Sequence, residues 1–183
     1  MKRPLLRLLL TVILAVLVMA SPASCQLTVI LSRHAEKAAA PPKDPPLSSA
    51  GEKRAALLAG LLTDVPVDAI YTSEYVRTQQ TAAPLAAHNH LKPIVVPAAD
   101  PAALVKAVRE RQTGVVVIVG HSNTVPGIIA ALGGPTVSIA DSEYDNLFIL
   151  TLDGSKSALL RLRFGDKSAA GVSDHSMATS PVK

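Results

Sequence analysis

The chain has 183 residues, of which 49% are hydrophobic and only 3% aromatic, and its formal net charge is +4. Its single cysteine excludes an intramolecular disulfide, so the fold must depend on its hydrophobic core. Without Lys2, Arg3 and Arg7, 15 basic residues face 14 acidic ones. This near balance and the absence of tryptophan argue against a nucleic-acid partner.

Residues 1–25 have the order of a secretory signal peptide. A basic start is followed by the apolar run 8–19 and then by small residues as far as Cys25. We expect cleavage after Ala23 and a periplasmic or secreted protein. An uncleaved membrane anchor is the alternative, although the run is shorter than the ~20 residues that span a bilayer. Lipidation of Cys25 is a further alternative, which the poor fit of Pro22 disfavours.

Residues 26–164 alternate between strand-like and helix-like segments, which predicts one α/β domain. In chain order we expect a strand ending at Ser32, a helix over 50–62, a strand over 68–72, a helix over 73–88, a strand over 91–97, a helix over 100–111, a strand over 114–119, a helix over 124–132 and a hairpin over 146–164. This order indicates a three-layer α/β/α sandwich with a mostly parallel central sheet and a closing C-terminal hairpin. Residues 165–183 are small and polar, as in a disordered tail.

Three of these strands end just before a basic or imidazole side chain. The first leads into Arg33 and His34, the second is followed by Arg77, and the strand over 114–119 leads into His121. Ligands of open parallel sheets bind beyond the carboxyl ends of the strands, so we expect these four side chains at one rim. Two guanidinium groups and two imidazoles form a site for a dianion, above all a phosphoryl group.

The motifs at these positions resemble those of the histidine phosphatase superfamily, which includes phosphoglycerate mutases and phosphohistidine phosphatases. They are Arg33-His34-Ala35-Glu36, then Ser73 with Arg77-Thr78-Gln79-Gln80-Thr81-Ala82, and Gly120-His121-Ser122. The resemblance covers about residues 27–164, with each motif after its own strand. It implies that His34 becomes phosphorylated and that a backbone carbonyl fixes its other ring nitrogen.

The residues suggest the same chemistry independently of the family. Phosphoryl transfer through histidine needs a neutral imidazole in line with phosphorus and a cationic cradle for the equatorial oxygens. His34 is the candidate nucleophile, and Arg33 and Arg77 the candidate cradle. His121 is expected to donate to a phosphoryl oxygen, with Asn123 as an additional phosphate ligand. This chemistry needs no cofactor or metal, and the sequence has no cluster with metal-ligand spacing.

The general acid for the leaving group stays open. Asp100 is the first candidate, although Asp100 before proline is also typical of a helix N-cap. Glu74 is the second candidate, and Glu143 or Asp145 the third. In the other branch of the superfamily the acid directly follows the second histidine, where this chain has Ser122. If no acid exists, substrates with good leaving groups are favoured, such as phosphohistidine or acyl phosphates.

The sequence therefore predicts a metal-independent phosphatase that hydrolyses a phosphomonoester or a phosphohistidine. The expected partner is a small phosphorylated substrate or a phosphoprotein, with membrane contact only through a retained or lipidated leader. A non-catalytic phosphate-binding or envelope-interaction protein is the alternative, because no carboxylate is unambiguously the acid. A phosphoglycerate mutase is less favoured, since the short chain leaves little room for insertions around the substrate mouth.

Overall fold

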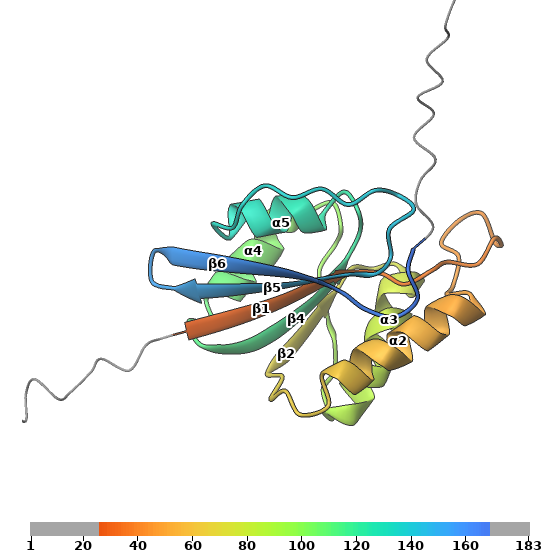
Figure 1. Cartoon of the computed structure of the whole chain (residues 1–183), viewed down its shortest axis with the longest axis horizontal. Coiled ribbons are helices and arrows are strands. Elements are labelled where there is room, and N and C mark those ends of the chain that lie inside the picture. Colours follow the sequence, from red (N-terminus) through yellow and green to blue (C-terminus); the bar gives the residue numbers. More distant parts are fainter. Residues whose placement is uncertain (1–25, 169–183) are drawn as a thin grey trace, which may run out of the picture.

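A six-stranded sheet lies between two layers of helices in the computed structural model, which describes residues 26–168 (Figure 1). The strands are β1 (Gln26–Arg33), β2 (Ala69–Thr72), β3 (Ile94–Val95), β4 (Gly114–Gly120), β5 (Asn146–Asp153) and β6 (Lys156–Arg163). The helices are α2 (Ser49–Leu61), α3 (Val76–His88), α4 (Pro101–Arg109) and α5 (Val125–Ala131). The predicted three-layer α/β/α architecture with a closing hairpin is confirmed. The predicted signal peptide and residues 169–183 of the predicted tail lie outside the described residues.

The strand order, β3-β2-β4-β1-β5-β6, brings the three motif-bearing strands together. β1 and β2 each pair with β4 in parallel, and β3 pairs with β2 in parallel. β5 pairs with β1 and β6 pairs with β5, both antiparallel, so the hairpin adds two antiparallel strands. Arg33 at the end of β1 pairs with Gly120 at the end of β4, and Thr72 of β2 pairs with Val119. The three strands therefore end at the same edge.

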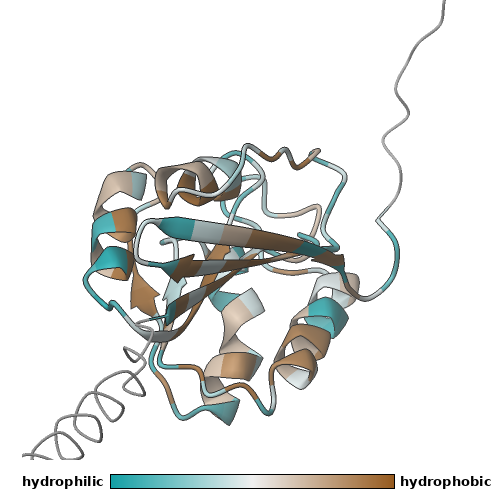
Figure 2. Cartoon of the chain, turned by 60° about the vertical axis from the view of Figure 1, so that its left-hand side comes forward, coloured by the Kyte–Doolittle hydropathy of each residue, from teal (hydrophilic) through white to brown (hydrophobic). Residues whose placement is uncertain are grey.

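Each face of the sheet is covered by one pair of helices. Along β4, Val116 and Ile118 pack in the core under α4 and α5, whereas Val117 and Val119 pack under α2 and α3. All four are at most 1% exposed, as expected for the central strand of a doubly covered sheet. Burying each such side chain contributes about 1.5–3 kcal/mol. Figure 2 shows this arrangement, with apolar strands between the two helical layers.

Two helix starts follow from their N-cap residues. The Ser48 hydroxyl accepts the Gly51 N–H at 3.2 Å, as the sequence predicts for α2. Asp100 caps α4 in the same way through the Ala103 N–H at 2.9 Å, with Pro101 as the first helical residue. Gly51 packs against the backbone oxygen of Glu36, where a Cβ would not fit. The start of α2 is thereby held close to the chain segment that follows His34.

Several elements are shorter than the sequence predicts, and α3 and β3 have a clear reason. α3 begins at Val76 rather than near Ser73, because the Ser73 hydroxyl bonds to side chains of the site instead of to the first helical turn. β3 has only two residues, since it is an edge strand between Pro93 and Pro97, which cannot donate to a ladder.

Two of the first four residues of the predicted tail, Asp166 and Ser168, form hydrogen bonds with the domain. The Ser168 hydroxyl donates to Asp145 at 2.9 Å, and the Asp166 carbonyl accepts from Arg54 at 2.9 Å. None of the helices within residues 26–168 is long and apolar enough to cross a membrane.

Candidate active site

Two buried histidines lie side by side just beyond the edge of the sheet. The ring centroids of His34 and His121 are 5.3 Å apart, and the rings are inclined by 65°. The His34 N–H donates to the Gly120 carbonyl at 2.8 Å, so the pairing of β1 with β4 continues up to the histidines. The side chains are thus fixed by the two adjacent central strands that carry them.

The environment of His34 defines its protonation. Its Nδ1 lies 2.8 Å from the Ala35 carbonyl oxygen, which can only accept, so Nδ1 carries the proton and Nε2 carries the lone pair. Burial lowers the pKa of His34 to about 3, and the charges of Arg33, His121 and Arg77 act in the same direction. The imidazole is therefore neutral near pH 7, with a nucleophilic Nε2.

Arg33 is almost entirely buried and points one edge of its guanidinium at a loop. Its Nη1 donates to three carbonyl oxygens, of Ala140, Asp141 and Glu143, at 2.8–3.1 Å. The guanidinium carbon lies 4.1 Å from the centre of the Tyr144 ring, a cation–π contact. Its Nε is buried without a partner among the described residues. Such a donor costs about 1–3 kcal/mol, which an anionic ligand would offset.

Arg77 reaches the same site from the second residue of α3. Its guanidinium lies 4.2 Å from the centre of the Tyr75 ring, and its Nη1 is 3.4 Å from the Asp44 carboxylate. Its Nε is also buried without a partner within residues 26–168. Arg33 and Arg77 therefore each have a buried N–H donor that no described residue accepts, close to the imidazoles of His34 and His121.

His121 is held by a short series of hydroxyl groups. Its Nε2 lies 2.9 Å from Ser73 Oγ, which lies 2.9 Å from Thr78 Oγ1. Burial lowers the pKa of His121 to about 4, and Arg77 lowers it further, whereas Glu74 opposes this. The Tyr75 ring packs edge-on against the imidazole at 5.3 Å. His121 is therefore neutral near pH 7 in the free protein.

The candidate acids are engaged elsewhere. Asp100 uses its carboxylate as the N-cap of α4. Glu74 accepts the Ala98 N–H at 2.8 Å, and this bond lowers the pKa of Glu74. Hydrogen bonds from Arg163 occupy Glu143 and Asp145 at 2.6 Å. Of these four, Glu74 is the one whose charge acts on His121, where it raises the pKa of the imidazole.

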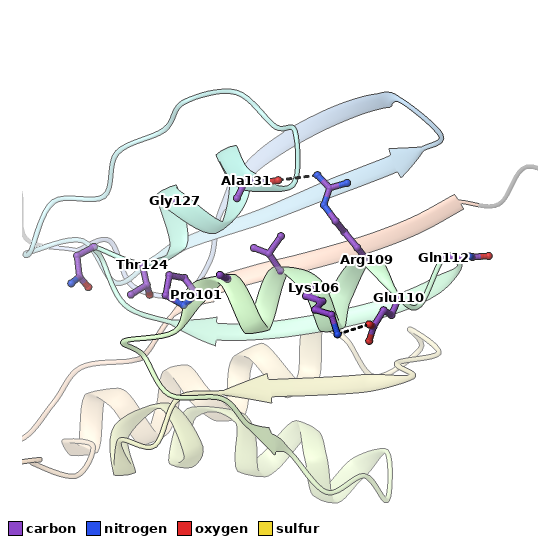
Figure 3. A pocket seen from close by; sticks show the side chains of 11 residues that line it. Pro101, Lys106, Arg109, Glu110, Gln112, Thr124, Gly127 and Ala131 are labelled. Carbon is purple, nitrogen blue, oxygen red and sulfur yellow. Dashed lines mark hydrogen bonds and ion pairs between the residues drawn. The ribbon is translucent and has the colours of Figure 1, made fainter.

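Asn123, the additional phosphate ligand that the sequence predicts, lines a different hollow. Asn123 is exposed and lines a hollow of about 820 Å³ between α4 and α5. Figure 3 shows this hollow, where Lys106 pairs with Glu110 and Arg109 donates to the Ala131 carbonyl. None of the four side chains lines it.

The site is also positioned by residues of the arginine motif that had no predicted role. Thr81 Oγ1 accepts the Ala35 N–H at 3.0 Å and so ties α3 to the segment after His34. Gln80 accepts the Leu47 N–H at 2.7 Å. The spacing of Thr78 and Thr81 on one helix side is a signal that could have identified them. Tyr144, whose ring lies 5.9 Å from His34, has no motif around it.

Within residues 26–168, no group of three or more His, Cys, Asp or Glu side chains is arranged to hold a metal ion.

Comparison with known proteins agrees with the resemblance in the motifs. The model of the histidine phosphatase superfamily (branch 1) matches residues 29–100, which include Arg33, His34 and Arg77. The predicted resemblance to this superfamily is therefore confirmed. No curated protein matches the chain.

Solved structures share the fold. The protein histidine phosphatase SixA complexed with tungstate has a TM-score of 0.63 at 20% identity, over 74% of this chain and 96% of that chain. A phosphoglycerate mutase from Bacillus anthracis str. Sterne has a TM-score of 0.61 at 15% identity, over 76% of this chain and 93% of that chain. A putative alpha-ribazole-5'-P phosphatase from Escherichia coli str. K-12 has a TM-score of 0.60 at 17% identity, over 79% of this chain and 99% of that chain. At these identities the likeness shows the fold alone.

Proposed function

We propose that this protein is a phosphatase that works through a phosphohistidine on His34. The observation that carries the proposal is the state of the His34 ring. Its Nδ1 is fixed by the Ala35 carbonyl, and its neutral Nε2 is beside two arginines whose buried Nε donors have no partner among residues 26–168. A neutral nucleophile in a cationic pocket is the arrangement that phosphoryl transfer through histidine requires.

The reaction has two displacements. In the first, the Nε2 lone pair of His34 forms a bond to phosphorus while the bond to the leaving group breaks. In the second, water forms the new P–O bond, the N–P bond breaks, and inorganic phosphate leaves. Arg33 and Arg77 neutralise the equatorial oxygens in both steps, and the N-terminal end of α3 adds its dipole. His121 donates to a phosphoryl oxygen.

The engaged carboxylates restrict the substrate class. The Ala98 N–H lowers the pKa of Glu74, which is opposite to the shift a general acid needs, and Asp100 is a helix cap, so neither is poised to protonate a leaving group. Substrates whose leaving groups depart without an acid are therefore favoured: phosphohistidine, acyl phosphates and aryl phosphates over alkyl phosphates. The fold relation to a protein histidine phosphatase supports a phosphoprotein substrate. We propose that the reaction needs no metal.

The test uses residues 26–183 with p-nitrophenyl phosphate and a phosphohistidine peptide, in the presence of a chelator. We expect turnover, and ³²P transferred to the protein in an acid-labile, base-stable form. His34→Ala should lose the adduct and at least about 10³-fold in kcat/KM. His88→Ala is the matched control, because His88 is an exposed histidine at the end of α3.

The outcomes separate the enzyme from its alternatives. Full turnover in His34→Ala contradicts the mechanism. Tight phosphate binding without adduct or turnover identifies a non-catalytic phosphate-binding or envelope-interaction protein instead. Transfer of the phosphoryl group between positions of phosphoglycerate, with little hydrolysis, identifies a mutase.

We further propose that the protein acts in the periplasm or outside the cell after removal of residues 1–23. Full-length chain expressed in a bacterial host should yield a mature protein that begins at Ser24, measured by intact mass. Full-length mass in the membrane fraction indicates an anchor instead, and an added lipid mass on Cys25 indicates a lipoprotein.

A further inference from the structure

A directed series of hydrogen bonds connects His121 to the backbone at the start of α3. Ser73 Oγ lies between His121 Nε2 and Thr78 Oγ1, at 2.9 Å from each. Thr78 Oγ1 in turn lies 2.8 Å from the Tyr75 carbonyl oxygen and 3.1 Å from that of Ser73. Ser73, Thr78 and His121 are all buried, so these bonds do not compete with bulk water.

Either hydroxyl of this series could donate to the other, and its end provides the basis for assigning a direction. We assign the Thr78 hydroxyl proton to the Tyr75 carbonyl oxygen, which can only accept and is its shortest contact at 2.8 Å. Thr78 Oγ1 is then an acceptor toward Ser73, and the Ser73 proton points at Thr78. Ser73 Oγ in turn accepts from His121 Nε2, which must carry a proton. The other ring nitrogen, Nδ1, makes no hydrogen bond with the described residues and is the one left for a ligand.

We propose that His121 takes up a proton when the site binds its phosphoryl dianion, because Ser73 and Thr78 hold Nε2 as a donor. Neutral His121 has a lone pair on Nδ1, which would repel an anionic oxygen. Only the imidazolium, with a second proton on Nδ1, can donate to the anion. The inference rests on the anion site of the proposed function and adds a proton coupling that this function does not require.

The charges around His121 are consistent with this coupling. Arg33 at the end of β1 and His34 after it lie on one side of His121. Glu74 and Tyr75 face it from the segment before α3, and Arg77 from the first turn of α3. In the free protein the two arginines and burial disfavour a third positive charge, and within the described part of the chain Glu74 is the anion that opposes them. A bound dianion reverses this balance, so protonation and binding stabilise one another.

The test measures protons taken up on anion binding by residues 26–183. Tungstate is the probe, since it remains a dianion and takes up no proton of its own at pH 7.5. Calorimetric titrations in buffers of different ionisation enthalpy should give an uptake of at least half a proton per tungstate bound. Long-range ¹H–¹⁵N spectra of the free protein should show the Nε2–H tautomer of His121.

Ser73→Ala distinguishes this positioning role from simple packing. Without the serine oxygen, neutral His121 can carry its proton on Nδ1 and donate directly. Uptake should therefore fall to less than half of the wild-type value while tungstate still binds. The single variant Thr78→Ser, which keeps a hydroxyl at the end of the series, should retain the wild-type value. Tight tungstate binding by the wild type without proton uptake, or an Nδ1–H tautomer in the free protein, overturns the inference. Absence of tungstate binding contradicts the proposed function itself.

Discussion

Two clusters of charge lie at the same end of the sheet and differ in how their charges are matched. In the hairpin cluster, Arg163 donates to Asp145 and to Glu143 at 2.6 Å each. In the site, Arg33 bonds to neutral carbonyls, and Arg77 has a carboxylate contact only at 3.4 Å. Both site arginines also keep a buried Nε without a partner among the described residues. Matched charge indicates a structural role, whereas surplus buried positive charge indicates a place for an anion.

Substitution of Arg54 should have the largest effect on stability, because this arginine is buried and its charge is paired with a carboxylate. It pairs with the Glu36 carboxylate at 2.6 Å and donates to the Phe164 carbonyl at 2.6 Å. Arg54→Ala leaves Glu36 without its partner, so we expect the free energy of unfolding to fall by about 3–5 kcal/mol in urea. Activity per folded molecule should change less than about threefold. Lys53→Ala, an exposed neighbour on α2, is the control. Loss of activity at unchanged stability would move Arg54 into the site.

Arg77 should show the opposite behaviour. Arg77→Ala removes a charged donor from ground and transition states alike, so kcat/KM should fall tenfold to a hundredfold or more, about 1.5–3 kcal/mol. Stability should hardly change. Arg77→Lys should recover only part of the loss, because lysine cannot form the bidentate fork.

The matched control for Arg77 is Arg163→Ala in the hairpin cluster. It should keep its kcat/KM and lose about 1–3 kcal/mol of stability, since its own side chain is 46% exposed but the Asp145 carboxylate that it leaves is only 6% exposed. Unchanged kinetics in Arg77→Ala would remove Arg77 from the site and with it the distinction between the two clusters.

The acid sensitivity of the fold is the third test. The pKa values of His34 and His121 are lowered to about 3 and about 4 in the fold, against 6.5 ordinarily. The unfolded chain therefore takes up protons first, so stability is complete above about pH 6.5 and falls as the pH decreases toward 4. The expected slope is about 1.4 kcal/mol per pH unit for each histidine. His34→Asn should reduce the slope by about half, measured by urea unfolding. A flat profile in the wild type would contradict this.

Asp100→Asn should have the smallest effect. Asparagine is also a good N-cap, so α4 should be retained with a stability change within about 0.5 kcal/mol. Turnover of aryl and alkyl phosphates should change less than about twofold if Asp100 is only a cap. A selective loss for alkyl phosphates would instead identify Asp100 as the general acid, and Glu74→Gln is then the comparison.

The sequence predicted the parts of the molecule that depend on local pattern. The apolar run over 114–119 gave the central strand, and the strand ends placed His34, Arg77 and His121 together. Contacts between distant loops were not predictable, because they depend on backbone conformation far along the chain. The stacking of Tyr144 on Arg33 is one example, and the late start of α3 is another, since it depends on the tertiary bonds of Ser73.

Loop exchange is a common route to new substrate specificity, and the loop over 140–143 limits it in this protein. Three of its carbonyls are the acceptors of the buried Arg33 Nη1. An insertion there would withdraw these acceptors from the buried guanidinium of Arg33. Under the proposed function, in which Arg33 binds the phosphoryl group, a change in this loop would also change phosphate affinity, so engineering of substrate range should preserve the length of 140–143.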